Sequence, residues 1–313
     1  MTSDYKKNNK IFNLTNILYV LLWLIQLLPN KTAGDESSFA LYTIVFMSAL
    51  ELIFIIISVF SAKSQLYATA KSIITTIFAV ITVWTLLTAK FSILNESMFP
   101  SFEIVLKQLI KDHSRLLGDV LSSFLTLCKG YLSALVLGIF LGSLAGMSKK
   151  LCGSLTYITS FLRLIPPIVY IPYAIACLPQ YSMVSTFVIF VASFWPIFAC
   201  TFSGVSNVDK QYIDSANVLN VNIFSRIWHI ILPASLSEIF IGCNQGLAYS
   251  FILLTSAEMI GGSSGIGYYI KYYSDFGDFK RIIVGIIVIG VMISIFTFIV
   301  NKIQKYLLRW KAN

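Results

Sequence analysis

The chain has 313 residues, of which 57% are hydrophobic and 12% are charged, and its mean hydropathy is +0.80. Charged residues make up about a quarter of an ordinary soluble domain, so this composition excludes one. Inside a bilayer each backbone polar group needs a partner, and a helix provides one within the same segment. The sequence therefore predicts an all-α polytopic membrane protein.

Eight apolar segments are long enough to cross a hydrocarbon core of about 30 Å as helices. The first follows a short basic stretch, and we expect an uncleaved span because the apolar run is long for a signal peptide. Prolines interrupt the fifth segment at Pro166, Pro167 and Pro172. The predicted spans are residues 11–29, 39–61, 67–89, 119–146, 155–178, 182–205, 234–258 and 282–301.

The formal net charge of +9 is unevenly distributed between the predicted loops. With the N-terminus inside, the cytoplasmic loops hold an excess of basic residues, among them Lys149, Lys150 and Arg226, whereas charges balance on the outer side. This asymmetry follows the positive-inside rule and favours a cytoplasmic membrane protein with both termini inside. Anionic lipid explains the charge better than nucleic acid does.

Segment 91–118 has apolar residues at helical spacing, including Phe102, Val105 and Leu109, and lysines on another face. This pattern predicts an amphipathic helix on the outer membrane surface, where it could also touch a partner protein. Further along, Gly138, Gly142 and Gly146 recur at every fourth position. Such spacing makes a smooth helical groove, so we expect close helix packing there rather than a ligand site.

Residues 206–233 form a polar segment between two apolar spans. Its apolar residues follow each other at three- and four-residue spacing, and Asn220 can adopt a left-handed turn. The pattern predicts a helix, a turn and a second helix that enters the membrane at Pro233, where proline suits a first turn. A plain solvated connection is the alternative. The candidate functional residues of this segment, which could contact a partner protein, are Asp214, Ser215, Ala216, Leu219, Asn220, Ile223, Leu232 and Pro233.

Residues 257–270 contain four glycines within seven positions, which cannot continue a stable helix. We expect a compact re-entrant loop, open to water or buried in protein. The nearby Glu258 could anchor this loop by accepting hydrogen bonds from its amides, or it could act in a gate or pathway. The candidate pathway residues are Glu258, Gly261, Gly262, Gly265, Gly267, Arg163, Pro166 and Pro167.

Two further carboxylates lie within predicted spans. Glu238 is near the cytoplasmic end of its span and could reach water, whereas Glu51 lies in mid-span and the sequence gives it no role. Lys71 and Lys129 also lie in or at the ends of spans, so ion pairs could form.

Sequence motifs for chemistry are absent. The chain has no G-x-x-x-x-G-K-[ST] phosphate loop and no H-E-x-x-H motif. Its two histidines, His113 and His229, are too far apart to suggest a metal site. We therefore expect neither an enzyme nor a resident metal or cofactor.

Several segments resemble permease subunits of ATP-binding-cassette (ABC) importers. The Asp214 segment resembles the signature E-A-A-x-x-x-G-(nine)-I-x-L-P of these subunits, and Ala257–Tyr268 resembles the nitrate, taurine and aliphatic sulfonate branch. Other matches to that branch occur in the same order and extend the resemblance over roughly residues 97–311. They are Gly130–Tyr131, Leu137–Gly142, Arg163–Pro167, Ile171–Pro172, Phe194–Ile197 and Leu308–Trp310.

The sequence departs from that branch in a few places. Asp214 and Ser215 replace Glu and Ala, Asn220 replaces a glycine, and Thr126 stands where an arginine is common. Three spans precede residue 97, where the branch usually has one.

The resemblance implies a type I ABC importer permease core with extra N-terminal helices. Residues 1–95 would form the N-terminal membrane segment, and residues 96–313 the core with its coupling loop at about 206–233. The implied partners are two copies of an ATPase that binds ATP and Mg, an external solute-binding protein, a second copy of this chain, and lipid. The solute would be small, and could be an anion such as a sulfonate or nitrate. An ATP-independent secondary transporter, marked by inverted repeats, and a membrane scaffold without transport remain as alternatives.

Overall fold

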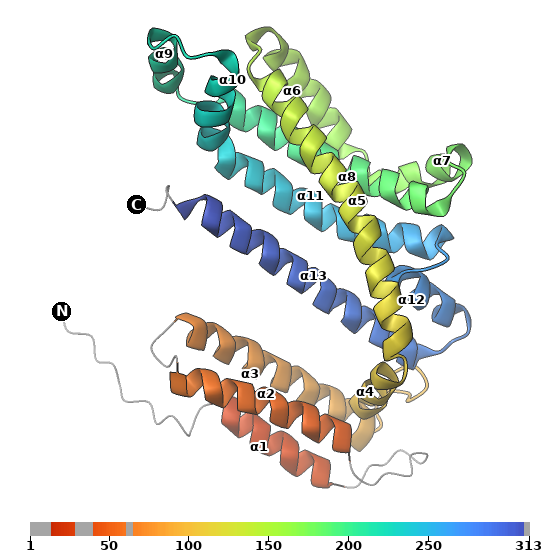
Figure 1. Ribbon diagram of the computed structural model, residues 1–313. Coiled ribbons are helices and arrows are strands. Elements are labelled where there is room, and N and C mark those ends of the chain that lie inside the picture. The colour runs from red at the N-terminus through yellow and green to blue at the C-terminus, as the bar shows by residue number, and fades with distance from the viewer. Residues whose placement is uncertain (1–13, 29–39, 61–64, 310–313) are drawn as a thin grey trace, which may run out of the picture. The chain divides into compact units, whose positions relative to one another are not determined.

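The computed structural model describes residues 14–28, 40–60 and 65–309 (Figure 1). Within these ranges every regular element is a helix, which confirms the predicted all-α class. The chain divides into two compact units. The first comprises Met1–His113 with Phe276–Val284, and the second comprises Ser114–Asp275 with Gly285–Asn313.

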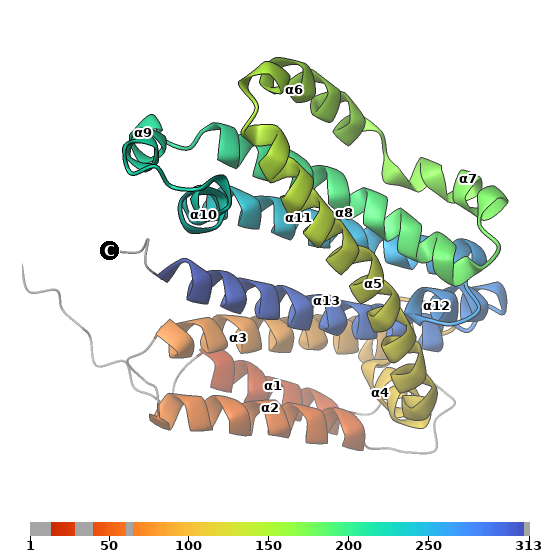
Figure 2. The same ribbon diagram turned by 45° about the horizontal axis from the view of Figure 1, so that its top comes forward.

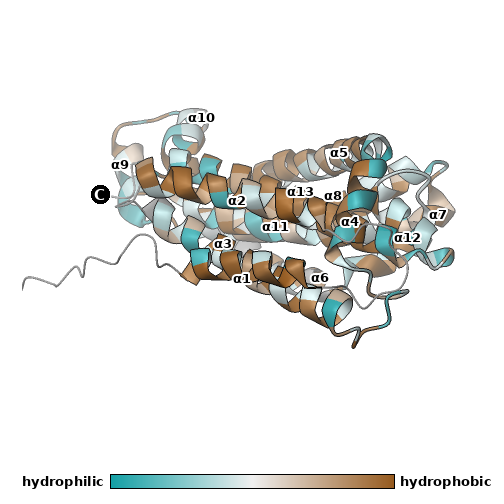
Figure 3. Cartoon of the chain, turned by 90° about the horizontal axis from the view of Figure 1, so that it is seen from below, coloured by the Kyte–Doolittle hydropathy of each residue, from teal (hydrophilic) through white to brown (hydrophobic). Residues whose placement is uncertain are grey.

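The first unit contains a bundle of three apolar helices, α1, α2 and α3, followed by the short helix α4. Its core includes Leu22, Met47, Phe54 and Phe78. Apolar residues also cover much of the outer surfaces of α1 and α2, as expected for helices in lipid (Figure 3). The bounds are Leu14–Leu27 for α1, Leu41–Phe60 for α2, Gln65–Thr85 for α3, Leu86–Lys90 for the π-helix η1 and Phe102–Lys111 for α4.

The second unit is built on three long helices, α5, α8 and α11, together with most of α13 (Figure 2). The long helices are α5 (His113–Gly146), α8 (Tyr181–Ser206), α11 (Leu232–Gly261) and α13 (Phe279–Leu307). The shorter elements are α6 (Lys149–Leu164), η2 (Pro167–Val169), α7 (Tyr170–Cys177), α9 (Lys210–Val218), α10 (Ile223–Arg226), η3 (Ile227–Ile231) and α12 (Ile266–Asp275).

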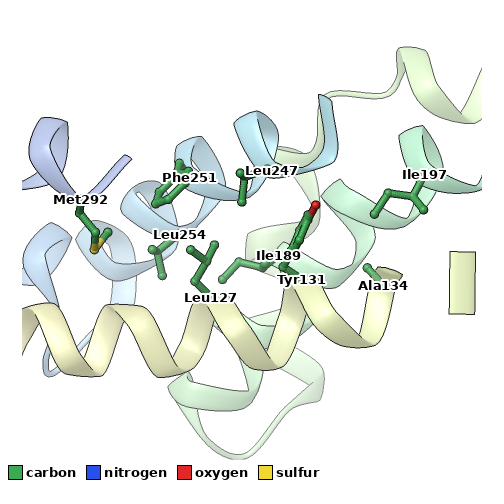
Figure 4. Packing of buried hydrophobic residues seen from close by; sticks show 9 residues of the cluster. All are labelled: Leu127, Tyr131, Ala134, Ile189, Ile197, Leu247, Phe251, Leu254 and Met292. Carbon is green, nitrogen blue, oxygen red and sulfur yellow. The ribbon is translucent and has the colours of Figure 1, made fainter. Parts of the chain in front are cut away.

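The core of the second unit joins these four long helices (Figure 4). α5 contributes Leu127, α8 contributes Ile189, α11 contributes Phe251 and α13 contributes Met292. The hydroxyl of Tyr131, on α5, donates a hydrogen bond of 3.0 Å to the carbonyl of Cys243 on α11. The polar end of this buried tyrosine is therefore satisfied inside the apolar core.

The glycines of α5 lie directly against α8. A Cβ added to Gly138 would lie 2.9 Å from Ile197, and one added to Gly142 would lie 2.8 Å from the Cβ of Thr201. A Cβ added to Gly146 would lie 2.7 Å from the Cβ of Val205. No side chain fits at any of the three positions, so the two backbones are close enough to exclude even alanine without a shift.

Six described helices are long and apolar enough to cross a membrane: Leu41–Phe60, Tyr67–Lys90, His113–Gly146, Tyr181–Ser206, Ile227–Gly261 and Phe279–Leu307. A seventh would be the pair Ser154–Leu162 and Pro167–Cys177, which is bent by 71°. Eight spans were expected. In the described part of the first predicted span, α1 has 14 residues. That corresponds to about 21 Å, which is short of a full crossing.

The bend of the seventh candidate has a local cause. Ile165 precedes Pro166 and is extended, with φ −70° and ψ 118°. A residue before proline avoids the helical region because the proline ring collides with its backbone. Pro166 and Pro167 thus end α6 and turn the chain into η2.

Candidate functional site

The polar segment between α8 and α11 begins with a capped helix. Asp209 is the N-cap of α9, and its side chain accepts a hydrogen bond of 3.1 Å from the N–H of Gln211. This bond satisfies one of the amide groups that the first turn of a helix leaves without partners.

The other end of α9 is capped at Asn220. This residue has φ +49°, the left-handed conformation expected from the sequence. The N–H of Val221 donates to the carbonyl of Ala216 at 3.0 Å, and the N–H of Asn220 donates to that of Asn217 at 3.1 Å. This pair of bonds is a Schellman motif, in which glycine usually occupies the left-handed position. Asparagine tolerates the same conformation, which explains the departure from the glycine of the resembled signature.

The second helix of the segment runs into the membrane span without a break. α10, η3 and α11 follow one another directly from Ile223 to Gly261. Pro233 lies near the start of α11, but it stands inside this continuous run and does not begin a separate helix. Proline cannot donate an amide hydrogen bond and its ring crowds the preceding turn. The π-helical turn Ile227–Ile231 just before it accommodates this disruption.

Apolar side chains lie exposed on this segment. Leu219 is 74% exposed, and Ile223 is also exposed, as are Asp214 and Ser215. Ala216, by contrast, is buried at 1% exposure. Leu232 and Pro233 are half-buried at the base of the span. Sequence reasoning missed three more exposed apolar side chains, Tyr212, Val218 and Trp228, although each stands out within a polar stretch.

The glycine-rich loop lies at the opposite end of the unit from α9 (Figures 1 and 2). Gly261 ends α11, and α12 starts at Ile266, so Gly267 lies inside the new helix. The three successive amides of Gly265, Ile266 and Gly267 each donate to a buried side chain. The acceptors are Asp119 Oδ1 at 3.1 Å, Ser123 Oγ at 2.9 Å and Glu258 Oε2 at 2.8 Å.

Glu258 is the centre of this network and is 5% exposed. Its Oε1 accepts the hydroxyl proton of Ser123 at 2.7 Å, while its Oε2 accepts the amide of Gly267. Both oxygens thus face donors, and the N-terminus of α12 adds a favourable electrostatic field for a carboxylate. The hydrogen bond expected between Glu258 and an amide of the glycine-rich segment is present, and its donor, Gly267, lies in the first turn of α12.

Two of the glycines, Gly265 and Gly267, leave space for the Glu258 side chain, whereas Gly261 and Gly262 face other atoms. Gly265 has φ +104°, and a Cβ there would collide with Glu258 Oε1. A Cβ at Gly267 would lie 2.6 Å from the carbonyl oxygen of Thr255, and one at Gly261 would collide with the ring of Tyr181. One added to Gly262 would lie 2.6 Å from the carbonyl of Glu258.

Arg115 adds a second contact between α5 and α12, which sequence reasoning missed. Its guanidinium donates a hydrogen bond of 2.7 Å to the hydroxyl of Tyr273 and lies 5.0–5.4 Å from the ring centres of Tyr269, Tyr272 and Tyr273. Its Nε is 3.7 Å from Asp119 Oδ2. The hydrogen bond and the cation–π contacts hold α5 and α12 together at this end, whereas the ion pair with Asp119 lies within α5.

The remaining pathway candidates lie on a different part of the unit. Pro166 and Pro167 line a cavity of about 380 Å³ together with Trp195 and Tyr249. The side chain of Arg163 lies outside the described residues. Geometry thus brings Glu258 and the four glycines together and leaves the two prolines apart from them.

Long apolar helices, a capped polar helix between two of them and a glycine-rich loop held by buried carboxylates define a polytopic helical membrane protein. The chain belongs to the family of binding-protein-dependent transport system inner membrane components, whose model matches residues 134–313. It is therefore a multi-pass inner-membrane protein. This membership confirms the resemblance to ABC importer permeases and gives no support to an ATP-independent secondary transporter.

Permeases named for nitrate, bicarbonate and aliphatic sulfonates are similar to this chain over part of its length. The nitrate import permease protein NrtB of Leptolyngbya laminosa is 32% identical over 177 residues, 56% of this chain and 63% of that protein. The bicarbonate transport system permease protein CmpB of Synechococcus elongatus is 30% identical over 62% of this chain and 70% of its own length. The putative aliphatic sulfonates transport permease protein SsuC of Bacillus subtilis is 29% identical over 66% and 75%. The chain thus spans less than two-thirds of the nitrate permease.

A solved structure shows the same fold. A chain of the MetNI methionine ABC transporter, in inward-facing conformations, superposes with a TM-score of 0.52. The match covers 64% of this chain and 98% of that chain at 15% identity.

Proposed function

We propose that this chain is the membrane-spanning permease subunit of an ABC importer. One observation carries the proposal. In this chain the short helix α9 lies between the spans α8 and α11, is capped at both ends, and bears exposed apolar side chains. An apolar patch on a polar cytoplasmic segment is suited to docking on another protein. The partner would be an ATPase that carries the ATP and Mg, because this chain has no phosphate-binding loop.

The structure suggests how movement of the ATPase would reach the membrane. α9 is stiffened by Asp209 at one end and Asn220 at the other, so it would move as a unit. From Ile223 the backbone stays helical into α11. A displacement of α9 and α10 by a closing ATPase pair would therefore tilt α11. That tilt would open the solute path to one side of the membrane and close it to the other. In this proposal both termini and α9 lie on the cytoplasmic side.

The assembly would contain two copies of this chain, two ATPases and an external binding protein that delivers the solute. A small anion is the proposed solute class, since the printed names of the relatives refer to nitrate, bicarbonate and aliphatic sulfonates. The cavity beside Pro166 and Pro167 and the loop around Glu258 are the proposed pathway and gate elements.

Affinity purification of the tagged chain in mild detergent, followed by mass spectrometry, tests the assembly. We expect a stoichiometric P-loop ATPase, and a co-purifying binding protein would then identify the solute by its own ligand. If vanadate and ATP trap no ATPase with the chain, the importer proposal fails, and uptake driven by protons or sodium becomes the next test.

Variants of the exposed patch test the docking role. Leu219→Glu should uncouple ATP hydrolysis from uptake while the chain still inserts, and Asp214→Lys should act in the same direction. Asn222→Glu adds the same charge to the segment without removing an apolar side chain, so it serves as the control. Ala216→Glu is unsuitable, because Ala216 is buried and the change would unfold α9 itself. Normal coupled uptake by Leu219→Glu would contradict docking through this face.

A further inference from the structure

The N-terminal bundle carries a buried carboxyl group that the importer function does not use. Glu51 lies in the middle of α2 and is 6% exposed. It belongs to the buried stripe of that helix, with Met47 one turn before it and Phe54 close to one turn after it. Both of these neighbours belong to the apolar core of the bundle, so Glu51 points into protein and not toward lipid.

The surroundings of Glu51 do not suit a charge. Its Oε2 is fully buried and has no hydrogen-bond partner among the described residues. A carboxylate with a buried oxygen that no donor reaches is costly in an apolar interior, and such a group usually takes up a proton instead. Glu258 provides the contrast within the same chain, since it is equally buried but receives two hydrogen bonds.

A line of polar groups leads from Glu51 toward the end of the bundle where α2 begins. Ser48 lies one turn away on the same face, and its hydroxyl is 3.1 Å from that of Tyr19 on α1. Tyr19 lines a cavity of about 10 Å³ together with Gln26 and Thr43. That volume is close to what a single water molecule requires.

The line ends at a second carboxyl group. The hydroxyl of Thr43 donates to Glu103 Oε2 at 2.9 Å, and the amides of Tyr42 and Thr43 donate to Glu103 at 3.2 and 2.8 Å. Lys107, whose side chain is 32% exposed, lies 4.0 Å from Glu103. These polar groups therefore lie between the buried Glu51 and the end of the bundle that carries Glu103 and Lys107.

We propose that Glu51 is a proton-binding site of the N-terminal bundle, a neutral carboxylic acid that exchanges its proton through Ser48, Tyr19 and the cavity beside Thr43. Protons are the ligand that this geometry suits, because a metal ion would need several oxygen donors around the carboxyl group. The titratable side chains on the helices packed against α2 are Tyr19 on α1, Tyr67 and Lys71 on α3, and Glu103, Lys107 and Lys111 on α4. A rival arrangement is an ion pair with Lys71, which would keep Glu51 ionised.

Glu51 lies outside residues 134–313, and its proton would be held whether or not the chain imports a solute. Failure of the importer proposal and failure of this one are therefore distinguishable.

Infrared spectroscopy of the full chain in a lipid bilayer tests the site. At neutral pH we expect a carbonyl band of a protonated carboxyl group in the wild type, lost in Glu51→Gln and retained in Glu258→Gln. A spectrum without such a difference between wild type and Glu51→Gln would show an ionised Glu51 and overturn the proposal. In heavy water the band should shift more slowly in Tyr19→Phe than in the wild type. Equal rates would overturn the proposed route.

A second measurement uses the wild-type chain alone, so its result does not depend on whether a variant folds. Dicyclohexylcarbodiimide enters from the lipid phase and modifies protonated carboxyl groups buried in membrane proteins. Peptide mass spectrometry should find the adduct on Glu51. Modification of Glu258 with Glu51 left untouched would contradict the assignment of the proton.

Discussion

Glu258 accepts a hydrogen bond from Gly267, and the Glu258 side chain leaves no room for a side chain at position 267. The Glu258 carboxylate accepts the amide proton of Gly267 at 2.8 Å, and a Cβ on residue 267 would lie 2.8 Å from the Cβ of Glu258. The carboxylate can reach the amide only because residue 267 has no side chain. The position of the buried acid thus explains the glycines at 265 and 267.

Gly267→Ala should destabilise the chain. The new methyl group would also lie 2.6 Å from the carbonyl of Thr255, and backbone atoms cannot move aside cheaply. Overpacking of this kind costs roughly 1–3 kcal/mol. Thermal unfolding in detergent should show the loss, and solute uptake by the assembled importer should fall with it.

Gly290→Ala is the matched control for this substitution. Gly290 lies within α13, and a Cβ there meets nothing within 4 Å. Alanine favours a helix over glycine by roughly 0.5–1 kcal/mol, so this variant should be neutral or slightly stabilised. Equal losses of stability in the two variants would refute the steric explanation for Gly267.

Glu258→Gln should also destabilise the chain, for an electrostatic reason. The two carboxylate oxygens face two donors, the hydroxyl of Ser123 and the amide of Gly267. Glutamine replaces one oxygen by an NH₂ group. If this group faces Gly267, two donors meet, and if it faces Ser123, the hydroxyl must accept and its own proton loses the carboxylate acceptor. A buried donor without an acceptor costs roughly 1–3 kcal/mol. The control is Glu238→Gln on the same helix, where the carboxyl is exposed and little change is expected.

The sequence predicted the local features of these sites better than the long-range ones. The left-handed Asn220 and the helix break after Gly261 follow from residue types and spacing, because each depends on neighbours within one or two turns. Asp119 and Ser123 could not be found in this way. They meet the loop across 146 and 143 residues, and a lone Asp or Ser near the end of an apolar helix has many ordinary roles.

The span count differed for a similar reason. Hydropathy finds apolar segments, but whether a segment crosses the membrane depends on its helix length and direction. The described part of α1 is short, and the extended Ile165 bends the fifth predicted span. Proline positions in the sequence indicated where the bend would be, but not its angle of 71°.

Asn220→Ala should loosen the capped helix α9. Residue 220 has φ +49°, which costs an ordinary residue roughly 1–2 kcal/mol. Amide hydrogen exchange over residues 210–218 should therefore become faster, whereas Asn220→Gly should leave it unchanged. Asn217→Ala serves as the control, because this residue is inside the helix and alanine is favoured there. Faster exchange in Asn217→Ala than in Asn220→Ala would contradict the role of the left-handed turn.

Gly142→Ala should push α5 and α8 apart. A Cβ at Gly142 would lie 2.8 Å from the Cβ of Thr201 and 2.9 Å from the carbonyl of Phe198, so neither neighbour can rotate away. We expect a loss of roughly 1–3 kcal/mol in the free energy of unfolding. Gly118→Ala changes another glycine of α5 that meets nothing within 4 Å, and it should be tolerated. If unfolding in detergent gives Gly142→Ala the same stability as Gly118→Ala, the glycine groove does not set the distance between these helices.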